Sequence, residues 1–128
     1  MDVLGTTTRP PCGITLQVRA PRSGAAVVAV AGEMDEVEAE LLEHAVGELA
    51  APVELVVIDL TGVAFFGSRG LAALVIAQDT AQRRGVRVHV ATGEGNRRVV
   101  RPLQITGVDS VVPVFATVAE ALGDRVAP

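Results

Sequence analysis

The sequence contains no lysine, no tryptophan and no tyrosine, and only one cysteine. All 11 basic residues are therefore arginines, and 15 acidic residues outnumber them to leave a formal net charge of -4. The aromatic side chains are only Phe65, Phe66 and Phe115, too few to form the stacking surface that binds unpaired bases. An acidic chain also gains little from contact with a phosphate backbone. We therefore expect no nucleic-acid partner.

Metal and membrane sites are not indicated either. Cys12 has no partner for an intrachain disulfide, and neither His44 nor His89 lies near the spaced cysteines or histidines of a zinc site. The longest apolar runs have seven residues, far short of the roughly 20 that cross a membrane. The first residues lack the basic start and apolar stretch of an export signal. We expect no metal, no cofactor, no membrane insertion and a cytoplasmic location, while the oligomeric state is not indicated.

Length and composition fit one folded domain. A chain of 128 residues, 49% of them apolar, can bury roughly two-thirds of the surface that it exposes when unfolded, so it is not a disordered chain. Residues 1–12 carry three consecutive threonines and a Pro-Pro pair without helix or strand periodicity, and we expect a loose or disordered tail there. The domain then spans residues 13–122, and residues 123–128 form a frayed tail.

Strand and helix patterns alternate along the predicted domain. Period-two alternation and short valine-rich runs predict strands, and apolar stripes at helical spacing predict helices. The predicted strands are residues 14–20, 25–31, 53–60, 86–90 and 111–115, and the predicted helices are residues 36–49, 69–84, 96–105 and 117–122. This order predicts an α/β fold with a mixed, mostly parallel sheet of about five strands and about four helices. The first two strands should pair antiparallel.

Local signals mark several helix ends. Asp35 with Glu38, and Thr117 with Glu120, have the spacing of capping boxes, in which a side chain accepts a hydrogen bond from the first turn. Pro102 lacks a backbone N–H and should kink or shorten the third helix.

Two loops, residues 32–35 and 66–70, follow buried strands and open helices. Functional groups gather at the carboxyl ends of parallel strands, so Asp35 and Ser68 lie close together if their strands are neighbours. The Ser68 hydroxyl can act in two ways at the start of its helix. It can cap the helix and contribute about 1 kcal/mol. It can also accept a phosphate, which free backbone N–H groups and the helix dipole would hold.

Four motifs in this order resemble the STAS domain of bacterial anti-sigma factor antagonists: GEMD at residues 32–35, DLTGVAFFGSRGLAALV at 59–75, RPLQITGV at 101–108 and VAEAL at 118–122. The resemblance covers residues 13–122. It implies a regulatory protein without catalytic activity, which binds an anti-sigma factor that is also a serine kinase. Phosphorylation of the motif serine breaks such a complex, and a phosphatase restores it. Ser68 stands at the phosphoacceptor position.

The residues beside the acceptor depart from the family pattern. Gly67 stands where the family usually has Asp, and Arg69 stands where it has Ser or Thr, which places a permanent cation beside the hydroxyl. An alternative function is therefore a STAS scaffold or an accessory subunit without phosphoregulation, including a subunit of a lipid-transport assembly. The resemblance predicts phosphorylation at Ser68, and the predicted partner-binding residues are Glu33, Asp35, Gly67, Ser68, Arg69 and Gly70.

Two charged segments offer further candidate surfaces. Seven acids and no base occur from Glu33 to Glu48, which suits either a solvated helix face or a docking face for a basic partner. A smaller basic cluster contains Arg97, Arg98 and Arg101. Surface solubility accounts for this cluster, and we assign it no ligand.

A glycine-rich loop at residues 93–96 follows a strand and precedes a helix, as a dinucleotide-binding loop does. Arg98, however, stands where the third glycine of that motif allows close packing. A small-molecule or nucleotide-binding STAS module is a second alternative function. No grouping of nucleophile, base and acid predicts an enzyme.

Overall fold

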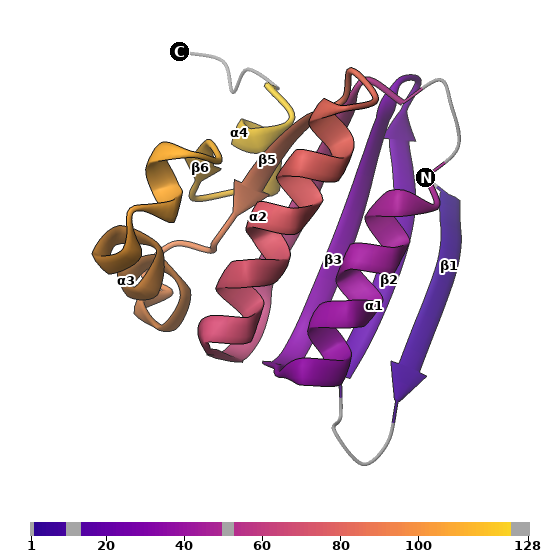
Figure 1. Ribbon diagram of the computed structural model, residues 1–128. Coiled ribbons are helices and arrows are strands. Elements are labelled where there is room, and N and C mark those ends of the chain that lie inside the picture. The colour runs from indigo at the N-terminus through magenta and orange to yellow at the C-terminus, as the bar shows by residue number, and fades with distance from the viewer. Residues whose placement is uncertain (1, 10–13, 50–52, 124–128) are drawn as a thin grey trace.

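The structure is a computed structural model that describes residues 2–9, 14–49 and 53–123. Along the chain the elements are β1 (Asp2–Arg9), β2 (Ile14–Arg22), β3 (Ala25–Met34), α1 (Glu36–Gly47), β4 (Leu55–Phe66), α2 (Ser68–Gln82), β5 (Arg87–Ala91), α3 (Arg97–Thr106), the 3-10 turn η1 (Val108–Ser110), β6 (Val114–Phe115) and α4 (Val118–Ala121). These elements confirm the predicted α/β class (Figure 1). The predicted C-terminal tail lies, from residue 124 on, outside the described residues.

One sheet contains the six strands in sequence order, from β1 at one edge to β6 at the other. The strand β2 pairs antiparallel with both β1 and β3, and the pairing of β2 with β3 is the one predicted for residues 14–20 and 25–31. The strands β3 to β6 pair parallel. Only Ser23 and Gly24 separate β2 from β3, and Gly24 has a φ of 81°, which a tight turn requires. Each parallel pair is instead joined through a helix.

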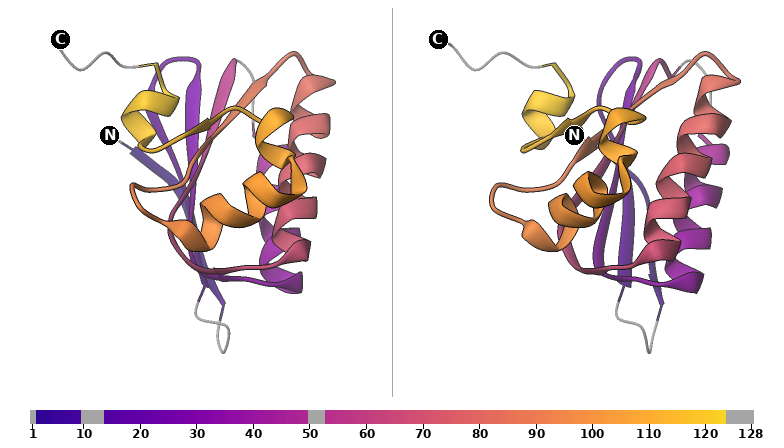
Figure 2. Two further views of the ribbon diagram at one scale, coloured as in Figure 1. Left: turned by 90° about the vertical axis from the view of Figure 1, so that its left-hand side faces the viewer. Right: turned by 60° about the vertical axis from the view of Figure 1, so that its left-hand side comes forward.

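Two hydrophobic clusters lie on the two faces of the sheet. The larger cluster contains buried side chains of α1, α2 and α3, and the smaller one contains Ala121 and Leu122 beside α4. Val28 and Val30 of β3 belong to the larger cluster, while Val27 belongs to the smaller one, as the strand pleat requires. The helices α1 and α2 lie side by side on one face and α4 lies on the other (Figures 1 and 2). The central strands are therefore buried on both faces.

Two parts of the sheet extend beyond the sequence-based prediction. Residues 2–9, which we expected to be loose, form β1 and pair along β2. An edge strand is held by backbone hydrogen bonds on one side, and its three β-branched threonines favour extended structure without apolar alternation. The strand β4 also continues to Phe66, well past the predicted end at residue 60. This extension brings the ends of β3 and β4 to one level.

The predicted third helix is present as α3 and continues across Pro102 to Thr106. Gly107 ends α3 with a φ of 79°, the left-handed conformation that glycine adopts at helix C-termini. Val99 and Leu103 are buried against the sheet, so packing maintains a helix from which Pro102 removes one backbone hydrogen bond.

The predicted capping box of α4 is confirmed. Thr117 Oγ1 accepts a hydrogen bond from Glu120 N–H at 3.1 Å, and Glu120 Oε1 accepts one from Thr117 N–H at 3.3 Å. We expect Thr117→Ala to lower the unfolding free energy by about 1 kcal/mol, because the helix start loses its side-chain acceptor. Chemical denaturation measures this change. Ser110→Ala, which removes a hydroxyl that donates to Gly107 O within its own turn, is a comparison variant. An unchanged stability of Thr117→Ala would contradict the prediction.

Candidate functional site

The strands β3 and β4 are parallel neighbours and end together. Met34, the last residue of β3, is the register partner of Phe66, the last residue of β4. The loops that follow, at Asp35 and Gly67, therefore begin side by side at the carboxyl edge of the sheet. This is the lower edge in Figure 1, where α1 and α2 begin. The sequence predicts that Asp35 and Ser68 lie close together if the strands before them are neighbours, and β3 and β4 are neighbours.

Ser68 is the first residue of α2 and is exposed. The helix cap is Gly67, so the expectation that Ser68 caps α2 is wrong. A capping residue must have a non-helical backbone, whereas Ser68 already has the helical one. Its hydroxyl makes no side-chain hydrogen bond with any described residue, and the first bond of α2 runs from Leu71 N–H to Gly67 O at 3.2 Å. The N–H groups of the preceding residues thus lie outside the helical ladder.

Gly67 has φ of -98° and ψ of -170°, an extended conformation open to any residue. The space for a side chain at position 67 is limited by Phe65, because a Cβ on Gly67 would lie 3.2 Å from the Phe65 ring. That ring is 51% exposed. An exposed aromatic side chain therefore covers the position where the family carries an acid.

Gly70 is buried in the first turn of α2. A Cβ at this position would lie 2.9 Å from two atoms of the Phe66 ring and 3.4 Å from Met34 Cβ. Phe66 and Met34 are themselves buried. Gly70 thus allows α2 to pack closely on the two strand ends, and it positions Ser68 without being accessible to a partner.

Arg69 does not point into solvent beside the Ser68 hydroxyl, as the sequence suggested. Its side chain, 25% exposed, reaches α1, where Nη1 lies 2.5 Å from Glu43 Oε2 and Nε lies 3.5 Å from Glu36 Oε1. The hydrogen bond to Glu43 raises the pKa of Arg69 above its ordinary value; desolvation opposes this rise, and the charges of Glu43 and Glu36 add to it. The pairs link the start of α2 to two successive positions on one face of α1, Glu36 and Glu43.

The two predicted acids of the first loop are both exposed. Glu33 lies near the end of β3, opposite Phe65 in register. Asp35 accepts a hydrogen bond from Glu36 N–H at 2.9 Å and lies directly before α1. The Glu38 side chain of the predicted capping box lies outside what the structure describes. Both acids are thus placed where a partner that contacts Ser68 can reach them.

An exposed apolar stripe continues from Ser68 along α2, and the sequence analysis missed it. Ala72, Val75 and Ile76 follow Ser68 at four, seven and eight residues, the spacing of one helix face. Val75 and Ile76 are 41% and 43% exposed. The signal was present in the sequence, since the seven-residue apolar run of this helix is longer than one buried stripe needs. Exposed apolar side chains that lie together on one helix face form a candidate surface for binding another protein.

The acidic segment of α1 is not a single solvated face. Glu36 and Glu48 have side chains that are 72% and 70% exposed, but Glu43 is only 20% exposed and turns toward Arg69. The basic cluster of α3 is exposed throughout. This cluster consists of Arg97, Arg98 and Arg101. Within the described ranges, none of the three makes an ion pair.

The glycine-rich loop is closed by its own hydrogen bonds. Gly93 N–H donates to Ala116 O at 2.9 Å, and the Asn96 amide donates to Thr92 O at 2.9 Å. Gly93 has a φ of 89°, a left-handed conformation that favours glycine, whereas a Cβ there would make only ordinary contacts with Thr61. A nucleotide-binding loop offers its N–H groups to phosphate, whereas the Gly93 N–H is bonded within the fold.

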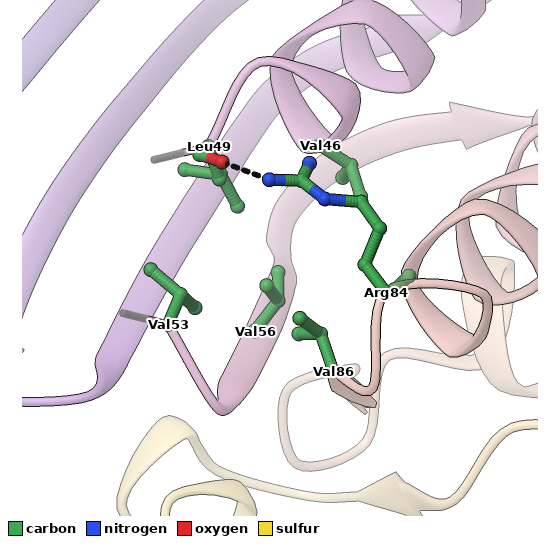
Figure 3. A pocket seen from close by; sticks show the side chains of 7 residues that line it. Val46, Leu49, Val53, Val56, Arg84 and Val86 are labelled. Carbon is green, nitrogen blue, oxygen red and sulfur yellow. Dashed lines mark hydrogen bonds between the residues drawn. The ribbon is translucent and has the colours of Figure 1, made fainter. Parts of the chain in front are cut away.

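A cavity of about 430 Å³, including its open mouth, lies between the C-terminal ends of α1 and α2. It is lined by aliphatic side chains and Arg84, namely Val46, Leu49, Val53, Val56, Ala81, Arg84 and Val86 (Figure 3). The Arg84 guanidinium donates to Leu49 O at 2.7 Å and to Gly47 O at 2.9 Å. This cavity lies at the opposite end of α1 and α2 from Ser68, and it does not belong to the candidate site.

The described part of the chain contains neither a cluster of metal-binding side chains nor a membrane-spanning helix. No group of three or more His, Cys, Asp or Glu side chains there could hold a metal ion. None of its helices is long and apolar enough to span a bilayer.

The fold is that of a small α/β domain with one six-stranded mixed sheet. The family model described as "STAS domain" matches residues 17–121, and the chain belongs to this family. The chain is 39% identical over 117 residues to the anti-sigma-F factor antagonist RsfB of Mycobacterium tuberculosis, spanning 88% of this chain and 89% of RsfB.

Solved structures show the same fold. A crystal structure of an anti-sigma factor antagonist from Mycobacterium paratuberculosis superposes with a TM-score of 0.73 and 34% identity, covering 91% of this chain and 97% of the other. The anti-sigma factor antagonist SpoIIAA in its unphosphorylated form, at 16% identity, has a TM-score of 0.68 and covers 84% of this chain and 92% of its own. The resemblance that the four motifs indicated is confirmed at the level of family and fold.

Proposed function

We propose that this protein is an anti-sigma factor antagonist that binds an anti-sigma factor with serine kinase activity and is released when Ser68 is phosphorylated. The observation that carries the proposal is the exposed Ser68 hydroxyl at the start of α2, next to the exposed stripe of Ala72, Val75 and Ile76. The names of the similar proteins support the kind of partner. The role is regulatory, and the chain serves as substrate of the kinase rather than as an enzyme.

The proposed contact surface contains both apolar and charged groups. The α2 stripe supplies apolar area, and Phe65 extends it beside Gly67. Glu33, near the end of β3, and Asp35, directly after it, lie at the same edge of the sheet. A kinase that binds this surface reaches the Ser68 hydroxyl without any rearrangement of the chain, because no described side chain covers it.

Phosphorylation changes the charge at the centre of this surface. The phosphate adds roughly -1.5 to -2 charges at pH 7, on a chain whose formal net charge is already -4. A partner surface that fits an uncharged hydroxyl and an apolar stripe must then desolvate a dianion. Release follows, since burying an unpaired charge is strongly unfavourable. A phosphatase that removes the group restores binding.

The test is incubation of the protein with ATP and the candidate anti-sigma factor, followed by mass spectrometry. We expect addition of one phosphate to the wild type and to Ser110→Ala, and none to Ser68→Ala. Ser110 is the matched control because it is also an exposed serine. Binding without phosphate transfer would contradict release by phosphorylation. Phosphorylation of Ser110 would show that Ser68 is not the phosphoacceptor.

A second candidate function is a STAS scaffold that binds its partner without phosphoregulation. The observation that favours it is the pairing of Arg69 with Glu43 and Glu36, which fixes the residue after Ser68 without any phosphate. A scaffold of this kind retains its partner when Ser68 carries a negative charge, and the phosphoregulated protein does not.

A further inference from the structure

The Arg69 guanidinium is the charged group that connects the Ser68 end of α2 to α1. Glu36 and Glu43 are seven residues apart on α1, so they lie on one face of that helix, and Arg69 contacts both of them. Arg83, by contrast, pairs with Asp79 within α2. In the described part of the chain, the Arg69 pairs are the only ion pairs between the two helices.

The pair with Glu43 differs from an ordinary surface ion pair. The side chains of Arg69 and Glu43 are only 25% and 20% exposed, and Nη1 and Oε2 lie 2.5 Å apart. Glu36, at 3.5 Å and 72% exposed, is the weaker partner. Partial burial strengthens such a contact, and it also makes loss of one partner unfavourable for the charge that remains.

A phosphate on Ser68 introduces a competitor for the same guanidinium. In this step the Ser68 hydroxyl oxygen forms a bond to the γ-phosphorus of ATP, the bond to the bridging oxygen breaks, ADP leaves and the hydroxyl proton passes to a base of the kinase. A guanidinium has five N–H donors in a planar fork that matches phosphate oxygens, and arginine side chains are long enough to change partner. A dianion on the neighbouring residue attracts this cation more strongly than a single carboxylate does.

We infer that Arg69 couples phosphorylation of Ser68 to α1: the phosphate draws the guanidinium away from Glu43 and Glu36, and the link between the start of α2 and α1 weakens. This inference rests on the proposed function, because it takes Ser68 as the phosphoacceptor. Arg69 is then a positioning residue. A partner that contacts both helices distinguishes the phosphorylated from the unphosphorylated protein by the Arg69 contact with α1 as well as by the charge at Ser68. Arg69 stands where the family pattern has Ser or Thr, so the pattern itself does not include this cation.

The test is a double-mutant cycle at Arg69 and Glu43 in proteins with either serine or phosphoserine at position 68. Phosphoserine is incorporated during translation, so no kinase is needed. The cycle compares the unfolding equilibria of wild type, Arg69→Gln, Glu43→Gln and the double variant. With serine at position 68 we expect a coupling of about threefold in the unfolding equilibrium constant. With phosphoserine we expect the coupling to disappear.

A matched cycle at Asp79 and Arg83, the ion pair within α2, serves as the control and should give the same coupling in both forms. The Arg69 Nε–H NMR signal adds a direct readout: it should shift on phosphorylation, while the Arg83 signal should not. An Arg69–Glu43 coupling that is equal in the two forms, with an unshifted Arg69 signal, would overturn the inference.

Failure of this inference can be told apart from failure of the proposed function. If the anti-sigma factor never phosphorylates Ser68, the proposed function fails, although incorporated phosphoserine can still draw Arg69 from α1. If the coupling does not change, phosphorylation of Ser68 can still release the partner through its charge alone.

Discussion

Gly70→Val is expected to lower the unfolding free energy by about 2–3 kcal/mol, because the new side chain enters the space of the Phe66 ring. A Cβ alone would lie 2.9 Å from two ring atoms, and the ring is only 6% exposed. Met34 Cβ also lies 3.4 Å from that Cβ position, so the two methyl groups of valine extend into a region that buried side chains already occupy. Helix propensity favours most residues over glycine by up to about 1 kcal/mol, which is less than the expected cost of the overlap.

Gly47→Ala is the matched control for this prediction, measured by chemical denaturation alongside Gly70→Val. Gly47 is the last residue of α1, and no atom lies within 4 Å of a Cβ placed on it. This variant should be more stable than the wild type by about 0.4–1 kcal/mol, because alanine lowers the entropy of the unfolded chain. A second test places Gly70→Ala together with Phe66→Leu, which removes the ring. If Gly70→Val were as stable as the wild type, α2 would not depend on close packing here.

The close approach at Gly70 has a consequence for the site. Phe66 ends β4 and Ser68 begins α2, with only Gly67 between them. Displacement of the Phe66 ring therefore shifts the turn that presents the hydroxyl. Variants at Gly70 should weaken partner binding through this movement, without removing any group that contacts the partner.

The alternation of strands and helices, and hence the parallel part of the sheet, could be predicted from hydrophobic periodicity alone. A valine-rich run such as residues 25–31 predicts a strand buried on both faces, because such a strand needs a continuous apolar sequence. Helix-capping signals also depend on residues close together in the sequence, and Thr117 and Glu120 form the capping box that their spacing predicts. By contrast, β1 was missed because an edge strand is stabilised by the backbone of its neighbour, which leaves little trace in side-chain pattern.

The candidate site was predictable in position but not in detail. That the loops at Asp35 and Gly67 begin at neighbouring strand ends agrees with the condition stated from the sequence. The identity of the α2 cap was not predictable from residue type, because serine is favoured both as a cap and in the first turn. The pairing of Arg69 with Glu43 depends on how α1 and α2 pack, a long-range feature that sequence spacing does not report.

Ser68→Asp is expected to weaken binding of the anti-sigma factor about 100-fold relative to wild type, while Ser68→Ala should bind about as tightly as wild type. Asp places one negative charge at the start of α2, next to the exposed stripe that includes Ala72 and Val75. A charge buried without a partner in an interface reduces affinity by 2–5 kcal/mol, which corresponds to about 30-fold or more. Isothermal titration calorimetry with the purified partner measures the difference.

Loss of folding cannot produce the same result. Ser68 occupies the first turn of α2, where a negative side chain interacts favourably with the helix dipole by about 0.3–1 kcal/mol, so Ser68→Asp should be at least as stable as the wild type. Ser23→Asp makes the same charge change in the turn before β3, at the amino end of that strand, and should leave affinity unchanged. If Ser68→Asp binds as tightly as Ser68→Ala, the surface tolerates charge and the scaffold function is favoured. If both variants bind weakly, the serine hydroxyl itself contacts the partner, and its phosphorylation would break that contact directly.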